Sequence, residues 1–299
     1  MFGAETLDHI AIPVTDLPRS EEFYLETVGL TFLTQRKNAD GSPRHTYVKA
    51  GDNILGLTLP GVQVPPSPSG APRYAIALAQ EEAFRAAAER IKASSVKCGD
   101  VQNHSGDSPF VRFFRFDDPD DNHMEICVRR QPLPSSAGVS HVIFETSNLA
   151  RAIRFYTQAL GLRPLGELEG ETLFEFANHQ ILGVKEVPEL SDRTKRKGRA
   201  CHVAFNVRQE DFDAILSLIP QLEGRSLGDF RATDGLRAPG ERSIYFFDPD
   251  TNYLQITALG KEDWTLLSDE EKWRRTIANR QEQGRGISRF DKGEKVEKD

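Results

Sequence analysis

The chain contains two copies of one sequence pattern, and this duplication restricts the fold more than any other feature does. The segment LDHIAIPVTDLPRSEEFYLETVGL, which begins at Leu7, returns as VSHVIFETSNLARAIRFYTQALGL, which begins at Val139. The two segments align at a shift of 132 residues, so that His9 corresponds to His141. A later segment, FDDPDDNHMEICV, returns as FFDPDTNYLQIT at a shift of 130 residues. Two shifts that agree this closely indicate a duplicated domain.

Each copy divides again into two units in which a strand precedes a helix and further strands follow. HIAIPV alternates as a strand does, and PRSEEFYLETVG carries apolar residues at helical spacing and ends at Gly29, a typical helix terminator. The next unit has the strand RYAIALA, the helix EEAFRAAAERIKASS, and the strands VRFFRF and HMEICV, joined by the turn DDPDDN. The second half repeats this order. The sequence therefore predicts an α+β fold of four βαβββ units that ends near Ala258.

Domain boundaries follow from the repeat. We predict one domain of two units at residues 1–132 and another at residues 137–259. The remaining segment, 260–299, lies outside the repeat and holds both tryptophans of the chain. Within it, Ser268 and Glu271 have the spacing of a capping box, which predicts a helix followed by a disordered end from about Gly284.

Composition limits the partners that we expect. A net charge of −7 and a pI near 5.6 argue against nucleic acid, which needs a clustered basic surface. No apolar run is long enough to span a bilayer, and MFGAETLDHI lacks the features of a signal peptide. The three cysteines share no CxxC spacing, so neither a disulfide framework nor a cysteine zinc site is expected. We expect a cytoplasmic protein that binds neither nucleic acid nor membrane, and exposed sheet edges and the tail favour a homodimer.

The motifs resemble those of the vicinal oxygen chelate superfamily. They are paired βαβββ units, a histidine in the opening strand, a D-L-x-x-S/A-x-x-F-Y helix and a D-P-D-x-N turn before an H-x-E-I strand. That superfamily includes glyoxalase I, extradiol dioxygenases, bleomycin- and fosfomycin-resistance proteins and methylmalonyl-CoA epimerase. The resemblance covers roughly Leu7 to Ala258. It implies that paired units curl into half-barrels, each with a cleft that can hold a divalent metal.

The resemblance also implies ligand positions on the first and the closing strands of the units. In the second half these are His141, His202 and Gln255, and in the first half they are His9, Tyr74 and Glu125. Imidazole and carboxylate on adjacent strands cover one face of an octahedral ion and leave the other face open to substrate oxygens. We expect iron(II) or manganese(II), with nickel(II) or zinc(II) as alternatives. An amide at position 255 lacks the negative charge of a carboxylate, which should lower metal affinity.

The pairing of the units decides which of these residues meet. If they pair in chain order, the site is His141, His202 and Gln255. If they pair in the exchanged manner of fused glyoxalases, His9 joins His202 and Gln255, while His141 joins Tyr74 and Glu125. His202 and Gln255 stay together in both arrangements, and the sequence alone does not choose between them. The alternative to a metal site is a set of strand histidines inherited from an ancestor.

Two further residues are candidates for the chemistry. Tyr245 precedes the Asp248-Pro249 turn. Its position resembles that of the tyrosine that binds a substrate oxygen in extradiol dioxygenases. His179 is a candidate acid/base, although a surface-turn histidine is an equal interpretation. The resulting hypothesis is an extradiol-dioxygenase-like enzyme that acts on a catecholic or similar substrate. A glyoxalase-like isomerase or lyase and a metal-free ligand-binding protein are the alternatives.

Overall fold

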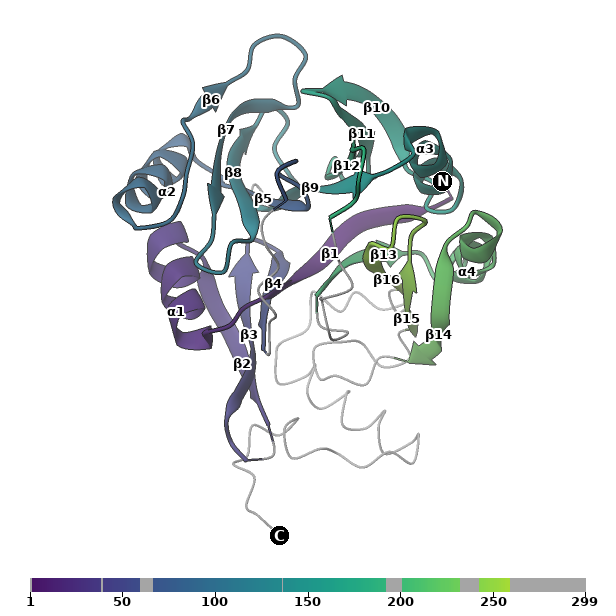
Figure 1. Ribbon diagram of the computed structural model, residues 1–299, viewed down its shortest axis with the longest axis horizontal. Coiled ribbons are helices and arrows are strands. Elements are labelled where there is room, and N and C mark those ends of the chain that lie inside the picture. Colours follow the sequence, from purple (N-terminus) through teal and green to yellow (C-terminus); the bar gives the residue numbers. More distant parts are fainter. Residues whose placement is uncertain are drawn as a thin grey trace.

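The computed structural model describes residues 2–38, 40–59, 67–135, 137–191, 201–231 and 242–258. These residues form two eight-stranded sheets with helices on their outer sides (Figure 1). The predicted α+β fold of four βαβββ units in two curled half-barrels is confirmed. The tail at 260–299, including the helix expected from Ser268, lies outside the described residues.

Module 1 is the first βαβββ unit, residues 4–58. Its elements are β1 (Ala4–Pro13), α1 (Leu17–Glu22), the π-helical turn η1 (Phe23–Val28), β2 (Thr31–Lys37), β3 (Pro43–Ala50) and β4 (Asn53–Thr58). The side chain of Asp16 caps α1 by accepting from the backbone N–H of Arg19 at 3.1 Å. The helical segment stops at Gly29, whose φ of 92° is left-handed, as predicted.

Module 2, residues 73–129, follows the same order. Its elements are β5 (Arg73–Ala77), α2 (Glu81–Ala93), β6 (Gln102–Asn103), β7 (Phe110–Asp117) and β8 (His123–Arg129). Glutamates stand in the first turn of α2 and basic residues in its last turn, which suits the helix dipole.

Modules 3 and 4 repeat the pattern over residues 138–186 and 202–258. Module 3 has β9 (Gly138–Thr146), α3 (Leu149–Gln158), β10 (Arg163–Leu168), β11 (Glu171–Glu175) and β12 (Ile181–Glu186). Module 4 has β13 (His202–Val207), α4 (Phe212–Gln221), β14 (Arg225–Arg231), β15 (Arg242–Phe247) and β16 (Tyr253–Ala258).

The modules pair in the exchanged manner. One sheet, which we call sheet A, joins modules 4 and 1 in the order β14-β15-β16-β13-β1-β4-β3-β2. The other, sheet B, joins modules 3 and 2 in the order β10-β11-β12-β9-β5-β8-β7-β6. Each of the ranges 1–132 and 137–259 therefore contributes one module to each sheet, and chain-order pairing of the modules is not found. The domain boundaries at residues 1–132 and 137–259 remain a prediction.

The helices, by contrast, associate in chain order. Figure 1 shows α1 beside α2 on one side of the molecule and α3 beside α4 on the other. Arg90 of α2 donates from Nε to the carbonyl oxygen of Thr27 at 2.8 Å, and Arg154 of α3 pairs with Glu223, just after α4, at 2.7 Å. Exchanged sheets and chain-order helices together hold all four modules in one body.

Strand alternation gives each sheet a face toward the helices and an inner face. On β1, Ile10 and Ile12 join the main apolar core with residues of the helices, while His9 and Ala11 stand on the opposite, inner face. Candidate site residues must lie on the inner faces, because the helix-covered faces are filled by the core.

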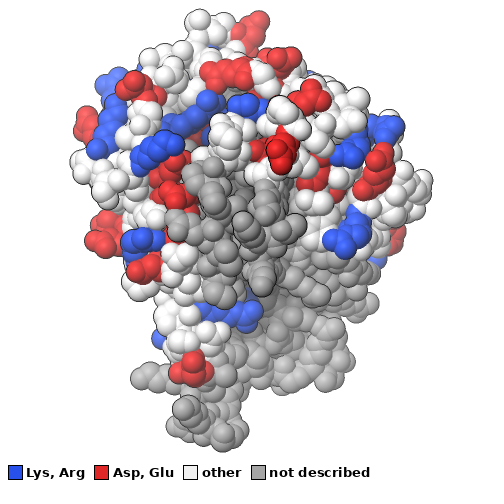
Figure 2. Space-filling model, in the orientation of Figure 1, with Lys and Arg blue, Asp and Glu red and all other residues white. Residues whose placement is uncertain are grey.

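Charged side chains of both signs are mixed on the described surface. Figure 2 shows acidic and basic side chains interspersed over the described part of one face of the molecule. No helix among the described residues has the length and apolar character needed to cross a membrane.

Candidate functional site

Two histidines from different modules meet on the inner face of sheet A. His9 of β1 and His202 of β13 approach through their Nε2 atoms at 2.9 Å, with the rings edge to face. The Nδ1 of His9 lies 2.6 Å from the Asp8 carboxylate. Because a carboxylate can only accept, Nδ1 carries the proton, and the lone pair of His9 Nε2 faces His202. The two histidines stand 193 residues apart in the chain, so only the exchanged pairing brings them together.

Gln255 of β16 adds an oxygen beside this pair. In the ladder of sheet A, Ala204 of β13 lies between His9 on one side and Gln255 on the other. The amide nitrogen of Gln255 donates to the Ser243 hydroxyl, while its Oε1 is buried and accepts no hydrogen bond. A buried carbonyl oxygen without a partner costs about 1–3 kcal/mol, so a cation at this point would relieve a real penalty.

The spacing of the two imidazole nitrogens fits a divalent metal. Two imidazole nitrogens at adjacent corners of an octahedron, each about 2.1 Å from an ion, lie about 3 Å apart. The 2.9 Å between the Nε2 atoms of His9 and His202 matches that spacing. A carboxylate hydrogen-bonded to the remote nitrogen of a ligating histidine is the usual support of such a ligand, and Asp8 supplies it here.

An aromatic wall borders the two histidines on the side of β15 and β16. Tyr245 and Tyr253 stack at 5.2 Å, and Phe247 lies 5.1 Å from Tyr253. The ring of His202 meets Tyr245 edge to face at 4.9 Å. Tyr245, a sequence candidate, therefore lies within the sheet A site, directly across the ladder from Gln255.

His45 of β3 is a polar residue of this face that the sequence analysis missed. It lies on the same side of its strand as Tyr47, whose ring contacts the inner face at Gly56 beside Ala11. The Nδ1 of His45 is buried without a hydrogen-bond partner. Burial and the nearby Arg44 and Arg36 lower the pKa of His45 to about 4, so its ring is neutral at neutral pH. Alternation along RHTYVK could have indicated it, but the family's ligand positions do not include it.

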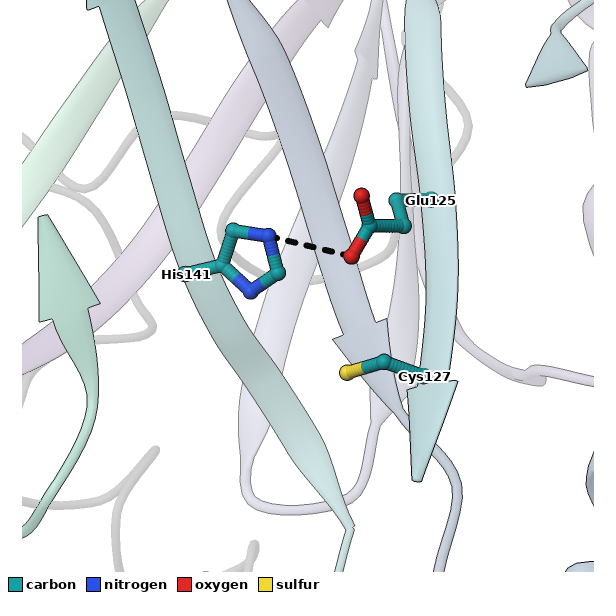
Figure 3. A group of neighbouring side chains, drawn as sticks. All are labelled: Glu125, Cys127 and His141. Atoms are coloured by element: carbon teal, nitrogen blue, oxygen red, sulfur yellow. Dashed lines mark ion pairs between the residues drawn. The ribbon is translucent and has the colours of Figure 1, made fainter. Parts of the chain in front are cut away.

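Sheet B has a second cluster, formed by Glu125 and Cys127 of β8 and His141 of β9. Their potential ligand atoms all lie within 4.8 Å of one another, and the three side chains are buried (Figure 3). The Nε2 of His141 lies 3.2 Å from Oε1 of Glu125, but this oxygen accepts no hydrogen bond of good geometry. These residues are a possible ligand set by type and distance.

The charges around this cluster do not favour an ion. Burial by itself would raise the pKa of Glu125, but His141, Arg73 and Arg115 outweigh it and lower that pKa to about 2. Burial, reinforced by Glu125, raises the pKa of the Cys127 thiol to about 12, which favours the protonated thiol. Burial likewise lowers the pKa of His141.

Module 2 places arginine where a ligand was predicted. Tyr74 packs in the main core on the helix-covered side of β5, so the expectation that it occupies a ligand position is wrong. Arg73 instead stands on the inner face, with its Nε 3.2 Å from Oε2 of Glu125. The reason is the period of a strand, in which a shift of one residue moves a side chain to the other face.

The predicted ligand set of His141, His202 and Gln255 is not brought together, because His141 lies in sheet B and the other two lie in sheet A. The second candidate pair, His9 and Glu125, is divided in the same way. The exchanged arrangement, one of the two left open by the sequence, is the one found. His9 joins His202 and Gln255 in sheet A, and His141 joins Glu125, but not Tyr74, in sheet B.

His179 lies away from Tyr245. It stands in the turn before β12, in module 3, with a left-handed φ of 70°. Its Nδ1 is 2.9 Å from the Glu175 carboxylate, and its side chain is 38% exposed. This environment agrees with the surface-turn interpretation of His179.

Comparisons with known sequences match the first module pair of the chain to one protein superfamily. The family model of the Glyoxalase/Bleomycin resistance protein/Dioxygenase superfamily matches residues 6–126. The metallothiol transferase FosB of Staphylococcus epidermidis is 31% identical over 141 residues, which cover 45% of this chain and 93% of that protein. FosB of Staphylococcus haemolyticus is 29% identical over 142 residues, with the same coverage.

Solved structures share the whole architecture. A protein described as a "putative dioxygenase" from Bacillus subtilis subsp. subtilis str. 168 superimposes with a TM-score of 0.66 at 15% identity, covering 91% of each chain. Glyoxalase I from Zea mays superimposes with a TM-score of 0.61 at 19% identity, covering 92% of this chain and 96% of that one. At these identities the likeness concerns the fold alone. Together with the sequence matches, it establishes that this chain belongs to the glyoxalase/bleomycin resistance protein/dioxygenase superfamily.

Proposed function

We propose that the protein is a metal-dependent enzyme whose active site is the inner face of sheet A. His9, His202 and Gln255 would hold the divalent ion, and a small substrate would chelate it through two vicinal oxygens. The observation that carries this proposal is the meeting of two facing Nε2 atoms, 2.9 Å apart, beside a buried amide oxygen with no hydrogen-bond partner.

The aromatic wall supports a planar aromatic substrate. The rings of Tyr245 and Tyr253 lie 4.9 and 6.0 Å from that of His202, and Phe247 packs beside Tyr253; such surfaces favour stacking with another ring. A catechol or a similar vicinal diol combines such a ring with two chelating oxygens. The reaction that we propose is oxidative cleavage of the ring next to the diol, with dioxygen as the second substrate.

A bound divalent ion would lower the pKa of the substrate hydroxyls, and iron(II) would also provide electrons to dioxygen. Side chains on the same inner face would handle the protons. Tyr245, across the ladder from Gln255, would hydrogen-bond a substrate oxygen through its hydroxyl. His45 would accept a proton at its unpartnered Nδ1, since its ring is neutral at neutral pH. Asp8 would hold the His9 ring in place.

Gln255 favours a second candidate function. An amide ligand removes one negative charge relative to a carboxylate, which weakens the hold on iron(II) more than it affects a metal used only as a Lewis acid. A glyoxalase-like isomerase or lyase, which needs substrate acidification but no dioxygen, is therefore the alternative. A metal-free binding protein is the outcome if no ion binds.

Metal content tests the proposal directly. The wild type and His9→Ala, His202→Ala and Gln255→Ala variants would be purified anaerobically, reconstituted with iron(II), manganese(II), nickel(II) or zinc(II), and measured by elemental mass spectrometry. We expect about one ion per chain in the wild type and a loss in all three variants. His141→Ala is the matched control, because it removes the corresponding histidine of sheet B.

The two enzyme classes are then separated by dioxygen uptake with a panel of catechols. Uptake that requires bound iron(II) or manganese(II) supports ring cleavage. Metal binding without uptake supports the isomerase or lyase. A wild type that binds none of the four metals after reconstitution would contradict the proposal.

A further inference from the structure

The second histidine–carboxylate centre, in sheet B, corresponds position by position to the site in sheet A. In sheet A, Ala204 lies between His9 and Gln255 in the ladder, and His202 stands two residues before Ala204. In sheet B, Ala75 lies between His141 and Glu125, and the residue two before it is Arg73. Arg73 therefore holds the place of the second histidine.

The correspondence extends to the support of the first histidine. A bulge in β1 sets Asp8 beside the Nδ1 of His9, and a bulge in β9 sets the Ser140 hydroxyl 3.1 Å from the Nδ1 of His141. In both sheets the residue before the histidine therefore orients the ring, and Nε2 faces inward. The inward Nε2 of His141 meets Glu125 and not a second imidazole.

The guanidinium groups of Arg73 and Arg115 supply the positive charge of this centre, and Arg73 is the buried one. The Nη2 of Arg73 donates to both oxygens of the Glu171 carboxylate at 2.8 Å, and its Nε lies 3.2 Å from Glu125. Arg115 donates from Nε to the same oxygen of Glu125 at 3.0 Å. Arg73, Glu125 and Glu171 are each at most 5% exposed, so this charge is not screened by water.

The inner face of sheet B is also closed by apolar packing. A cluster separate from the main core lies on this face and comprises Ala71, Ala77, Phe110, Phe113, Cys127, Leu133, Ile143, Leu173 and Ile181. The ring of Phe110 lies 4.6 Å from that of His141. A guanidinium remains charged at every ordinary pH, so it can serve as a permanent cation in such a setting.

We infer that Arg73 substitutes for a metal ion at this centre, and that Glu125 and His141 form a latent divalent-metal site that Arg73 keeps closed. A divalent ion would have to enter beside the fixed positive charge of Arg73, which together with Arg115 already neutralises Glu125. Replacement of Arg73 by histidine removes that charge and restores two imidazoles and a carboxylate on three adjacent strands. This arrangement suits zinc(II), nickel(II) or cobalt(II).

Cobalt(II) binding tests the inference in a background where sheet A cannot contribute. The His202→Ala variant should bind less than about one-tenth of an equivalent of cobalt(II). The His202→Ala/Arg73→His variant should bind about one equivalent, with visible ligand-field absorption. Adding Glu125→Gln to this double variant should abolish both the cobalt(II) binding and the absorption. The result is independent of the proposed function, because it is read in protein whose sheet A site has been removed.

Two results would overturn the inference. One is cobalt(II) binding by His202→Ala that disappears with Glu125→Gln, since Arg73 then does not exclude the ion. The other is a folded Arg73→His variant that binds no cobalt(II).

Stability provides the second measurement in case Arg73→His does not fold. Arg73→Met should lower the melting temperature by on the order of 10 °C, since it leaves the buried Glu171 carboxylate unpaired, and Arg73→Met/Glu171→Gln should recover part of that loss. Arg73→Lys, which keeps the charge, should lose less than Arg73→Met. Equal losses in all three variants would show that Arg73 acts through packing and not as a cation.

Discussion

The hydroxyl of Tyr24 in η1 donates to the buried carboxylate of Asp118 at 2.7 Å, which links module 1 to module 2 across the two sheets. The same contact recurs between Tyr156 of α3 and Asp248 at 2.5 Å, and it links module 3 to module 4. These bonds join modules in chain order, whereas the sheets join them in exchanged order. The F-Y motif of the sequence therefore supplies the donor of this contact, and the D-P-D motif supplies the acceptor.

Removal of this hydrogen bond should destabilise the protein. Tyr24→Phe leaves a buried carboxyl group with one donor fewer, so we expect a loss of about 1–3 kcal/mol in the free energy of unfolding, measured by urea denaturation. Tyr156→Phe is the matched variant and should cost a similar amount. A loss under about 0.5 kcal/mol in both would mean that the contact contributes little, as at an ordinary surface site.

The Asp8 carboxylate should set the metal affinity of the sheet A site. Asp8→Ala removes the acceptor of the His9 Nδ1 proton, and loss of such a partner typically weakens metal binding about 10–100-fold. Competition with a chromophoric chelator would measure the change. Ser140→Ala makes the corresponding change beside His141 and should leave the affinity unaltered. Equal weakening in both variants would contradict a metal site confined to sheet A.

Gln255→Glu should couple stability to metal more strongly than the wild type does. The new carboxylate would be buried, and the amide that it replaces donates to a hydroxyl and not to a charged group. The metal-free variant should therefore be less stable than the wild type. A bound divalent ion should more than reverse this loss of stability. The ion should also bind more tightly than it binds to the wild type, because the carboxylate ligand carries a full negative charge. Thermal unfolding with and without manganese(II) would measure both effects. A metal-free variant as stable as the wild type, with no added response to manganese(II), would argue against an ion at this position.

His45 should stay neutral well below the pH at which an ordinary histidine titrates. Its pKa falls from 6.5 to about 4 in the folded protein, so the fold favours the neutral ring. The corresponding stability is fully present above about pH 6.5 and is lost as the pH falls toward 4, because the unfolded chain binds the proton first. Nitrogen NMR of the imidazole would follow the titration, with His45→Gln as the assignment control. A midpoint near 6.5 would exclude the buried, partnerless environment that makes His45 a candidate proton acceptor.

The sequence determined the duplication, the four βαβββ modules and the strands that carry His9, His141, His202 and Gln255. These features are local, because strand alternation, helix caps and turns depend on neighbours in the chain. The sequence also predicted that His202 and Gln255 share a site under either pairing of the modules. Both residues belong to module 4, and their strands are adjacent.

Only the tertiary structure decided which modules share a sheet, and therefore that His9 and not His141 meets His202. Modules with similar sequences offer similar edges, so hydrogen bonds between strands far apart in the chain choose the pairing, and no local signal records that choice. The tertiary structure also decided that Arg73 and not Tyr74 faces inward. A single residue of register separates the two, and only the paired ladder fixes which side chain enters the cleft and which enters the core.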